Sequence, residues 1–421
     1  MKRRAQLFQV KRVVMRRGGR DNGGKVESGK ARLGSNEVPV GRRLISERQW
    51  QELERLLEPG RVQSGCAAPA SLDEVAAVVR WAAANQVQVL PGATGDESAI
   101  GLDMSGLRRQ RFYDPADLTL GCDAGVTAGE VMEWLAAAQQ FLPLDVGQPA
   151  LSLGAILGGH HSGPLRHFFG TVRDAAIGIE CVATDGSIVH GGGRVVKNVA
   201  GYDLMKLFIG SRGSLGVITG VNFKVSPWPR ETETVRLRPA DLDAVERVRH
   251  WVLHAPLRFL CCELRSDGIA WEVWLRYAGS QRVRERYRTE IATLLPAEPL
   301  DESVWSATLA QATGSRFDIS VPASAATRVL AALPVGNTAS LAGRLGLGVF
   351  AIQTQTELSD AEIETWRAVV AEARGFLSVR DARAMPATVR FGAPTHDYEL
   401  MRRVKRELDS QAVFPDPWGL T

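Results

Sequence analysis

Two glycine-rich stretches combine residue types and spacing that suit the binding of a phosphate group. Residues 91–96 read Pro-Gly-Ala-Thr-Gly-Asp, and residues 152–164 read Ser-Leu-Gly-Ala-Ile-Leu-Gly-Gly-His-His-Ser-Gly-Pro. Glycine allows backbone N–H groups to approach a phosphate without obstruction by a side chain. Two such stretches, about sixty residues apart in the chain, could hold a diphosphate between them. Either stretch alone is more often a tight turn than a cofactor site.

Neither stretch has the spacing of the two common nucleotide-binding motifs. The chain contains no G-x-x-x-x-G-K-[ST] loop, and no G-x-G-x-x-G that opens a helix and is followed by a distal acidic residue. A P-loop and a Rossmann dinucleotide site are therefore excluded. The two stretches predict a different way of holding a phosphate-containing ligand.

Regular elements are expected to position both stretches. Ser71 with Glu74 predicts a capping box at the start of a helix, and a strand at 87–90 leads into the first stretch. A strand at 118–120 and a helix at 131–135 precede the second stretch. The remaining elements of this part are a hairpin turning at Asp185-Gly186 with a type I′ turn and a long strand at 216–225. Mixed helices and strands of this kind indicate an α/β or α+β protein.

The rest of the chain has a different character. Residues 231–400 have fewer clustered glycines and alternating strands such as 271–275, which predict a second, cap-like α+β domain. A final helix is expected around 398–408, within a C-terminal segment at 401–421.

Composition narrows the class of protein. The 421 residues are 45% hydrophobic and 23% charged, as in ordinary globular proteins of two or three domains. No apolar run has the length of a membrane helix, so at most a peripheral membrane association is expected. The five cysteines show no C-x-x-C spacing, which argues against a disulfide framework or a cysteine-ligated cluster and favours a reducing, cytoplasmic compartment.

Residues 1–43 form a basic extension, with thirteen lysine or arginine residues against three acidic ones. The extension lacks apolar periodicity and is expected to be disordered. It could be an arm for an acidic surface or nucleic acid, an arginine-rich targeting peptide, or an over-long start with Met15 as an internal start. No folded nucleic-acid-binding motif supports the nucleic-acid alternative.

A series of motifs in a fixed order makes the chain resemble a known family. The series comprises Ser-Gly-Pro at 162–164, Gly-Thr-Val-Arg-Asp at 170–174, the Asp185-Gly186 hairpin, Val-Lys-Asn-Val-Ala-Gly-Tyr-Asp-Leu at 196–204 and Gly-Ser-Arg-Gly-Ser-Leu-Gly-Val-Ile-Thr at 210–219. It resembles the FAD-binding subunits of bacterial glycolate oxidase (glycolate dehydrogenase), within the vanillyl-alcohol-oxidase-like, PCMH-type flavoprotein superfamily. The resemblance is dense over residues 60–230. It is weaker at 401–419, where the family's Asn-Pro-Gly ending is replaced by Asp-Pro-Trp-Gly.

The resemblance implies an α+β fold with a two-lobed FAD-binding domain at 44–230 and a smaller α+β cap at 231–400. The lobes would span about 44–105 and 106–230, and residues 401–421 would return to the FAD domain. FAD would lie non-covalently between the lobes, since the first stretch has no histidine or cysteine for attachment. By this likeness the cofactor-binding residues are Pro91, Gly92, Ala93, Thr94, Gly95, Asp96, Gln148, Pro149, Ser152, Leu153, Gly154, Gly158, Gly159, Ser162, Gly163, Gly216, Val217 and Ile218.

Some residues depart from the family pattern. Ala93 and Ala155 stand where relatives have glycine, and Asp96 places a carboxylate where a diphosphate would be repelled. His160 and His161 replace small or apolar residues and could crowd the flavin ring. These departures leave open whether FAD binding is weakened or lost.

His160 and His161 are also the candidate catalytic residues. Either ring could serve as a general base or donate a hydrogen bond to the flavin, although a packing or solvent-facing pair is the alternative. A metal site is not expected, because adjacent residues rarely present both rings to one ion. Nearby, Arg166, Arg173 and Lys197 could bind phosphate or an acidic substrate, with an ion pair to Asp174 as the alternative for Arg173.

Two functions follow from the resemblance. In the first, the chain is an FAD-dependent subunit that oxidises a 2-hydroxy acid such as glycolate to the 2-oxo acid and passes electrons to partner subunits. In the second, it is an accessory subunit with weak or lost FAD binding. The implied partners are a larger catalytic flavoprotein subunit and an iron–sulfur subunit, in the cytoplasm or at the inner face of the membrane. No substrate-binding set of arginine and histidine residues is recognisable in 231–400.

Overall fold

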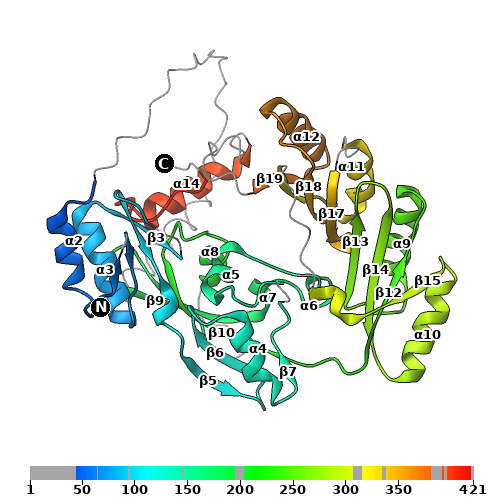
Figure 1. Cartoon of the computed structure of the whole chain (residues 1–421), viewed down its shortest axis with the longest axis horizontal. Helices are drawn as coiled ribbons and strands as arrows, with labels where there is room; N and C mark the ends of the chain where they lie inside the picture. The colour runs from blue at the N-terminus through cyan, green and yellow to red at the C-terminus, as the bar shows by residue number, and fades with distance from the viewer. Residues whose placement is uncertain are drawn as a thin grey trace, which may run out of the picture.

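The computed structural model describes residues 44–63, 65–92, 95–144, 147–194, 203–306, 315–333, 338–380, 391–392 and 396–418. The basic extension at 1–43, Ala93, Thr94 and the motif residues 196–202 lie outside the described residues, so the predictions made for them stay predictions. The domain boundaries also stay predictions. The described residues form three main sheets with helices packed against them (Figure 1).

The first sheet carries the strand that leads into residues 91–96. Its order is β1 (Val62–Gln63), β2 (Cys66–Ala67), β4 (Ala99–Leu102) and β3 (Gln88–Pro91), and both β2 and β3 run parallel to β4. Helices α2 (Glu47–Glu54) and α3 (Leu72–Asn85) cover it. Val75, Val78 and Val79 of α3 are fully buried against Val89 and Ile100, so the apolar stripe of this helix fixes β3 in place.

The second sheet holds the remaining glycine-rich segments. Its antiparallel order is β5 (Gln110–Asp114), β6 (Thr119–Asp123), β10 (Val217–Lys224), β8 (Ala176–Val182) and β9 (Ile188–Gly192). One face packs on α4 (Ala128–Ala136), α5 (Leu153–Gly159), α7 (Val172–Ala175) and α8 (Met205–Phe208). The short helix α6 (Arg166–Phe169) and the paired strands β7 (Gln140–Phe141) and β11 (Ser226–Pro227) lie beside it.

The third sheet has eight antiparallel strands. The order is β15 (Ala297–Leu300), β12 (Thr232–Leu237), β14 (Trp271–Ala278), β13 (Cys261–Ser266), β17 (Thr338–Arg344), β18 (Val349–Thr354), β16 (Arg316–Ser320) and β19 (Phe376–Arg380). Its apolar face is covered by α9 (Leu242–His254), α10 (Gln281–Ala292), α11 (Ala326–Ala332) and α12 (Asp360–Glu372). Among the described residues, the 3-10 turns are η1 (Met104–Gly106), η2 (Glu302–Ser306), η3 (Ala323–Ala325) and η5 (Leu345–Leu347).

The C-terminal segment packs back on the first two sheets. Helix α14 (His396–Leu408) contacts the second sheet's core through Val404 and Leu408, and Val413 and Phe414 are buried in the core of the first. Val89 N, in β3, donates a hydrogen bond to Val413 O at 2.8 Å. The last residues of the chain therefore hold the strand that leads into residues 91–96.

Most predicted elements are present within one or two residues, but the predicted capping box is incomplete. Ser71 Oγ accepts a hydrogen bond from Glu74 N at 3.2 Å and so begins α3 as expected. The Glu74 carboxylate accepts from Ala70 N at 2.7 Å rather than from Ser71 N. The cap thus satisfies a backbone donor one residue earlier than the motif predicts.

The hairpin at Asp185 and Gly186 is present, but its predicted turn type is wrong. Ala183 N donates to Ser187 O at 2.9 Å, and Gly186 N donates to Ala183 O at 2.8 Å. Gly186 is the one loop residue with positive φ, at +71°, whereas a type I′ turn needs two. The Asp185 carboxylate accepts from Ser187 N at 2.9 Å, which stabilises this three-residue loop instead.

Replacing Lys405 by methionine is expected to destabilise the protein strongly, because the Asp409 carboxylate would stay buried without its cation. Both side chains are at most 1% exposed and form an ion pair with each other. Breaking such a buried pair costs about 3–5 kcal/mol of unfolding free energy. Urea denaturation followed by tryptophan fluorescence measures the loss. Arg403→Gln, on the exposed side of α14, is the control, and a loss under about 1 kcal/mol for Lys405→Met would contradict the prediction.

Candidate functional site

Strand β3 ends at Pro91, and Gly95 and Asp96 of the first stretch pack against the first sheet. Gly95 is tightly enclosed, since a Cβ there would overlap the carbonyl oxygens of Gly65 and Ala99. At Gly92, by contrast, a Cβ would meet nothing within 4 Å. Gly95 therefore fixes the turn, and Gly92 leaves its backbone open to a ligand.

The Asp96 carboxylate is engaged within its own turn. Its Oδ1 accepts hydrogen bonds from both the backbone N and the hydroxyl of Ser98, each at 2.7 Å. Two donors on one oxygen offset part of the carboxylate's negative charge. The repulsion expected between Asp96 and a diphosphate is reduced in this arrangement.

The second glycine-rich stretch is a helix where the sequence suggested a loop. Ser152 caps α5 by accepting from Ala155 N at 3.2 Å, and apolar residues of α5 bury completely at helical spacing. A Cβ at Gly154 would lie only 3.2 Å from Ala124 O, so the helix closely approaches the end of β6. Ala155 sits in the first turn and its N–H is capped, so this departure from glycine suits the helix.

A loop at residues 210–214 brings the two stretches together. Arg212 N donates to Gly158 O at 2.9 Å, on α5. A Cβ at the neighbouring Gly213 would lie 3.2 Å from Pro91 Cγ, so Gly213 packs against the start of the first stretch. Residues 91–92, 158 and 212–213 therefore converge between the first and second sheets. Like Gly92, Gly158 is open, with nothing within 4 Å of its Cβ position.

The Arg212 side chain marks this convergence and was not among the predicted site residues. Its guanidinium lies over the rings of Phe391 and Trp418, at 5.5 and 5.1 Å from their centroids. Trp418 belongs to the C-terminal ending that departs from the family's Asn-Pro-Gly, and its carbonyl accepts from the Tyr398 hydroxyl at 2.7 Å. A charged residue between two glycines, in Gly-Ser-Arg-Gly-Ser, is the sequence signal that could have indicated it.

The other predicted cofactor residues are spread around this point. Gly216, Val217 and Ile218 lie at the start of β10, where the pairing with β8 begins at Val217 but the pairing with β6 begins only at Gly220. Gln148 and Pro149 are exposed, and Pro149 O accepts from Gly129 N of α4 at 2.8 Å. The structure thus ties Pro149 to the start of α4.

His160 and His161 follow the end of α5. His160 adopts a left-handed conformation, with φ of +52°, and both backbone N–H groups donate back to the helix. Burial lowers the pKa of His160, and the charges of Arg173 and Arg166 lower it further. Burial likewise lowers the pKa of His161, with added effects of Arg380 and Arg212. Both imidazoles are therefore neutral at pH 7.

The third sheet presents a charged face that the sequence reasoning missed. Apolar residues of its strands point toward α9–α12, and the alternate positions form what we call the polar face. It carries Glu263 and Arg265 on β13, Arg344 on β17, Asp318 on β16 and Arg380 on β19. Asp318 and Arg380 form an ion pair on neighbouring strands. Alternation of charged and apolar residues, as in Arg-Phe-Asp-Ile-Ser at 316–320, is the signal that could have predicted this face.

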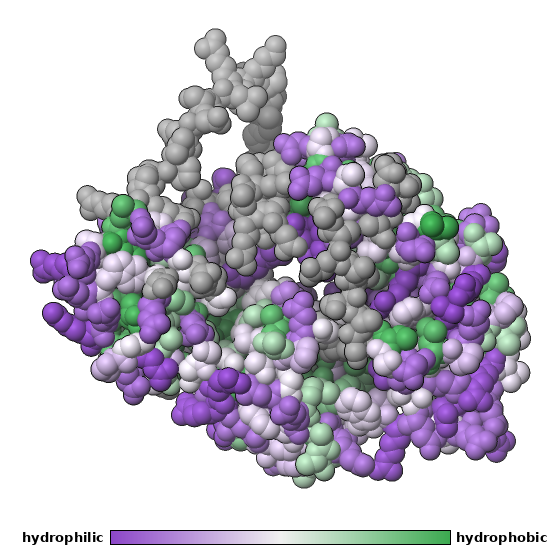
Figure 2. Space-filling view, in the orientation of Figure 1, coloured by the Kyte–Doolittle hydropathy of each residue, from purple (hydrophilic) through white to green (hydrophobic). Residues whose placement is uncertain are grey.

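The polar face contacts the segment that follows α5. Arg344 Nη2 donates to Ser162 O at 2.8 Å, and its Nε donates to Gly163 O at 3.3 Å. Arg380 and Asp318 both act electrostatically on His161. The third sheet therefore borders the predicted cofactor-binding residues Ser162 and Gly163 from the side opposite the first sheet (Figure 1). The visible face of the molecule is hollowed near its centre (Figure 2).

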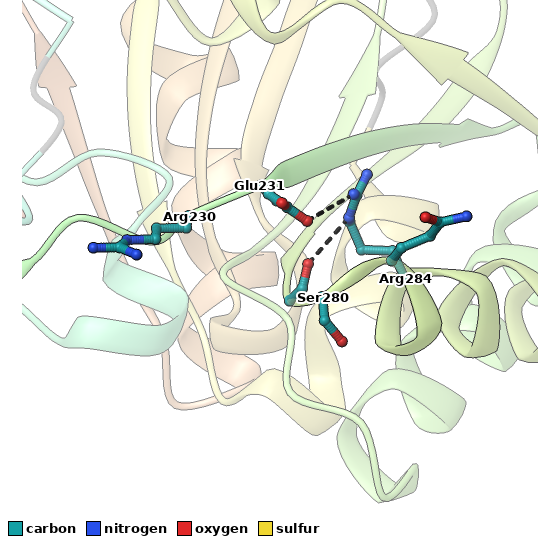
Figure 3. Close-up of a pocket in the computed structure, with 6 residues that line it drawn as sticks. Arg230, Glu231, Ser280 and Arg284 are labelled. Atoms are coloured by element: carbon teal, nitrogen blue, oxygen red, sulfur yellow. Dashed lines mark hydrogen bonds and ion pairs between the residues drawn. The ribbon is translucent and has the colours of Figure 1, made fainter.

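A pocket elsewhere does not belong to this site. It is lined by Arg230, Glu231, Gly279, Ser280, Gln281 and Arg284, where β12 and α10 begin (Figure 3). Arg284 Nη2 lies 2.9 Å from Glu231 Oε2, and Arg284 Nε donates to Gly279 O at 3.1 Å. These contacts join α10 to β12, and none of the predicted site residues lines the pocket.

Among the described residues, none of the helices combines the length and the apolar composition that spanning a membrane requires. Within the same residues, no group of three or more histidine, cysteine, aspartate or glutamate side chains could hold a metal ion.

Comparison with known proteins identifies the part of the chain that carries both glycine-rich stretches. A family model described as an FAD binding domain matches residues 64–192. Residues 64–192 are therefore similar to FAD binding domains. The match includes residues 91–96 and 152–164, and the resemblance seen in the sequence motifs is confirmed.

Curated relatives are similar over the same part of the chain. Over 173 residues the chain is 34% identical to glycolate oxidase subunit GlcE of Escherichia coli (strain K12), covering 40% of this chain and 47% of that subunit. Over 211 residues it is 28% identical to glycolate oxidase subunit GlcD of Bacillus subtilis (strain 168), covering 46% and 44%. It is 32% identical over 173 residues to the mitochondrial D-lactate dehydrogenase [cytochrome] of Arabidopsis thaliana, covering 39% and 30%. The chain thus spans less than half the length of each.

A solved structure extends the likeness of fold beyond that region. Alkyldihydroxyacetonephosphate synthase matches with a TM-score of 0.58 and 13% identity, over 83% of this chain and 76% of that chain. The predicted α+β class with an FAD-binding fold is confirmed.

The residues of the FAD binding domain fit the cofactor. Gly92 and Gly158 leave open backbone on two sides of the point where residues 91–92, 158 and 212–213 converge. Arg212 supplies a positive charge there, suited to a diphosphate or to an electron-rich ring. Backbone at Gly92 would hold the diphosphate, and residues 158–163 would line the ring.

Gly158→Val is expected to block FAD without harming the fold. Its side chain would enter open space in the free protein, and valine is no worse than glycine inside a helix. If FAD occupies that space, overpacking costs about 1–3 kcal/mol, which is roughly fivefold to 150-fold in Kd. Quenching of FAD fluorescence measures the Kd. Ala361→Val, on the exposed face of α12, is the matched control, and an unchanged Kd for Gly158→Val would refute this placement.

The buried histidines predict a loss of stability at acid pH. The pKa of His160 and of His161 lies below the ordinary 6.5, so the unfolded chain binds more protons than the folded one. The stability that the two neutral histidines contribute is complete above the ordinary pKa of 6.5, and it is lost as the pH falls from there through their lowered folded-state pKa. The melting temperature should therefore drop between about pH 7.5 and 5.5, and less so in the His160→Asn/His161→Asn double variant. The exposed His250→Asn is the control, and equal drops in all three proteins would contradict the assignment.

Proposed function

We propose that the chain is the FAD-binding subunit of an oxidoreductase that converts a 2-hydroxy acid, such as glycolate, to the 2-oxo acid. The observation that carries the proposal is the position of the Asp318–Arg380 pair on the polar face, close enough to His161 to shift its pKa. A cation and a neutral base at the end of the flavin-lining segment suit a small hydroxy acid. The relatives' names, glycolate oxidase and D-lactate dehydrogenase, share that substrate class.

The chain's own residues would bind and deprotonate the substrate. Arg380, which acts on His161, would attract the substrate carboxylate. Neutral His161 would accept the proton of the substrate hydroxyl, since its lowered pKa keeps its lone pair available at pH 7. Bound FAD would supply the two-electron acceptor.

The electrons would pass to partner subunits. Two relatives are named as glycolate oxidase subunits, which supports a multi-subunit complex. We extend this to a larger catalytic flavoprotein subunit and an iron–sulfur subunit, with the complex in the cytoplasm or at the inner face of the membrane.

An accessory role is the second candidate. The His161 ring favours it, because it lies against Gly159 where a flavin ring would pass. In that case a partner subunit performs the oxidation.

Anaerobic addition of glycolate to the FAD-loaded chain distinguishes the two functions. If the chain itself oxidises the substrate, the visible flavin bands should bleach. Arg380→Gln should then slow the bleaching by roughly tenfold or more, because a charge-assisted contact with the substrate is lost. Arg328→Gln, an exposed arginine on α11, should bleach like wild type. Stable flavin bands with glycolate and other 2-hydroxy acids would reject catalysis by this chain and favour the accessory role.

A further inference from the structure

Helix α9 carries two exposed histidines one turn apart. Of the seven histidines in the sequence, His250 and His254 are the pair with a spacing of four residues. Residues four apart on an α-helix lie one above the other, with their Cβ atoms about 5–6 Å apart. Figure 1 shows α9 on the outer side of the third sheet, away from β3 and α5. The pair is therefore separate from the proposed FAD site.

The two imidazole rings are stacked on each other. Their centroids are 4.1 Å apart, and their planes differ by 22°. Two nitrogen atoms that bind one tetrahedral Zn²⁺, each at about 2.0–2.1 Å, are about 3.3–3.4 Å apart. The stacked rings therefore need only a small side-chain rotation to bind one ion together.

A hydrogen bond within the pair fixes which nitrogen of His254 is available. His254 Nδ1 lies 2.7 Å from His250 O, and because a carbonyl oxygen can only accept, Nδ1 carries a proton. In the neutral ring the lone pair is then on Nε2. Histidines that bind metal ions commonly donate their other N–H to a carbonyl in this way, which orients the ring for the metal.

The pair supplies two ligands and leaves the other positions to solvent. Glu246 lies one turn before His250, but its Oε2 accepts hydrogen bonds from Arg249 Nε and Thr327 Oγ1, each at 2.8 Å. Its carboxylate is thus engaged, in agreement with the finding that no described group of three such side chains could hold a metal ion. Water would fill the remaining positions, as in metal sites that stay open to solvent.

We propose that His250 and His254 form a binding site for one divalent transition-metal ion on the outer surface of α9. Imidazole nitrogen is a suitable ligand for Zn²⁺, Ni²⁺ and Cu²⁺, with the highest affinity for Cu²⁺. The chelate forms only while α9 is helical, so metal binding and the folding of α9 are coupled. The site needs neither flavin nor turnover, so its failure would leave the proposed oxidation untouched.

Isothermal titration calorimetry of the full-length chain with Ni²⁺ tests the site. The chain is purified without a histidine tag and titrated at pH 8, where protons compete weakly for imidazole. We expect one Ni²⁺ to bind at the pair, and His250→Asn and His254→Asn should each weaken its Kd by about a hundredfold or more, because one ligand replaces a chelate. Both side chains are exposed, so the variants should fold like the wild type.

His190→Asn is the matched control for these variants. His190 is exposed on β9 and has no second histidine within four residues in the chain, so its variant should retain the wild-type Kd. A Kd that is unchanged in both α9 variants would place the metal elsewhere and overturn the proposal. No binding by the wild-type chain at millimolar Ni²⁺, or an equal loss in His190→Asn, would also overturn it.

The EPR spectrum of Cu²⁺ bound at less than one ion per chain counts the ligands independently of affinity. The wild-type chain should show the hyperfine pattern of two imidazole nitrogen atoms, and His254→Asn the pattern of one. A wild-type spectrum with one nitrogen ligand, or with oxygen ligands alone, would contradict the chelate.

Discussion

The buried ion pair between Lys405 and Asp409 connects the segments on which the rest of the site depends. Lys405 Nζ also donates to Ser214 O at 2.8 Å and to Phe414 O at 3.0 Å. Asp409 accepts from Thr184 Oγ1 at 2.9 Å and from the backbone of residues 413 and 414. Because every polar atom of the pair is satisfied, burial is tolerated. The C-terminal helix, the β8–β9 hairpin and the 210–214 loop are thereby held in one arrangement.

That arrangement explains why two glycine-rich stretches can act together. Ser214 belongs to the loop whose Arg212 binds Gly158 O and whose Gly213 contacts Pro91. The third sheet then borders the same region with the polar face, through the contact of Arg344 with residues 162–163. A cofactor in this region would therefore be held by backbone groups on one side and by charged side chains on the other.

Local patterns in the sequence predicted much of this fold. The apolar spacing of α3, the alternation in β14 and the motif series from Ser162 to Thr219 were sufficient for the elements and the FAD resemblance. Long-range contacts were beyond the sequence, because Arg212 and Arg380 become site residues only through packing of separate sheets. Helix α5 was not predicted, because the four glycines between residues 152 and 163 obscured the Ser152 cap and the buried leucines.

The proposed site places FAD between the first two sheets, with its ring along the segment that follows Gly158. The most direct measurement is an X-ray structure of the chain crystallised with FAD. This placement predicts diphosphate density beside Gly92 and ring density along residues 158–163, with Arg212 in contact with the cofactor. Density for FAD at any other place, or none at saturating FAD in a folded protein, would contradict it.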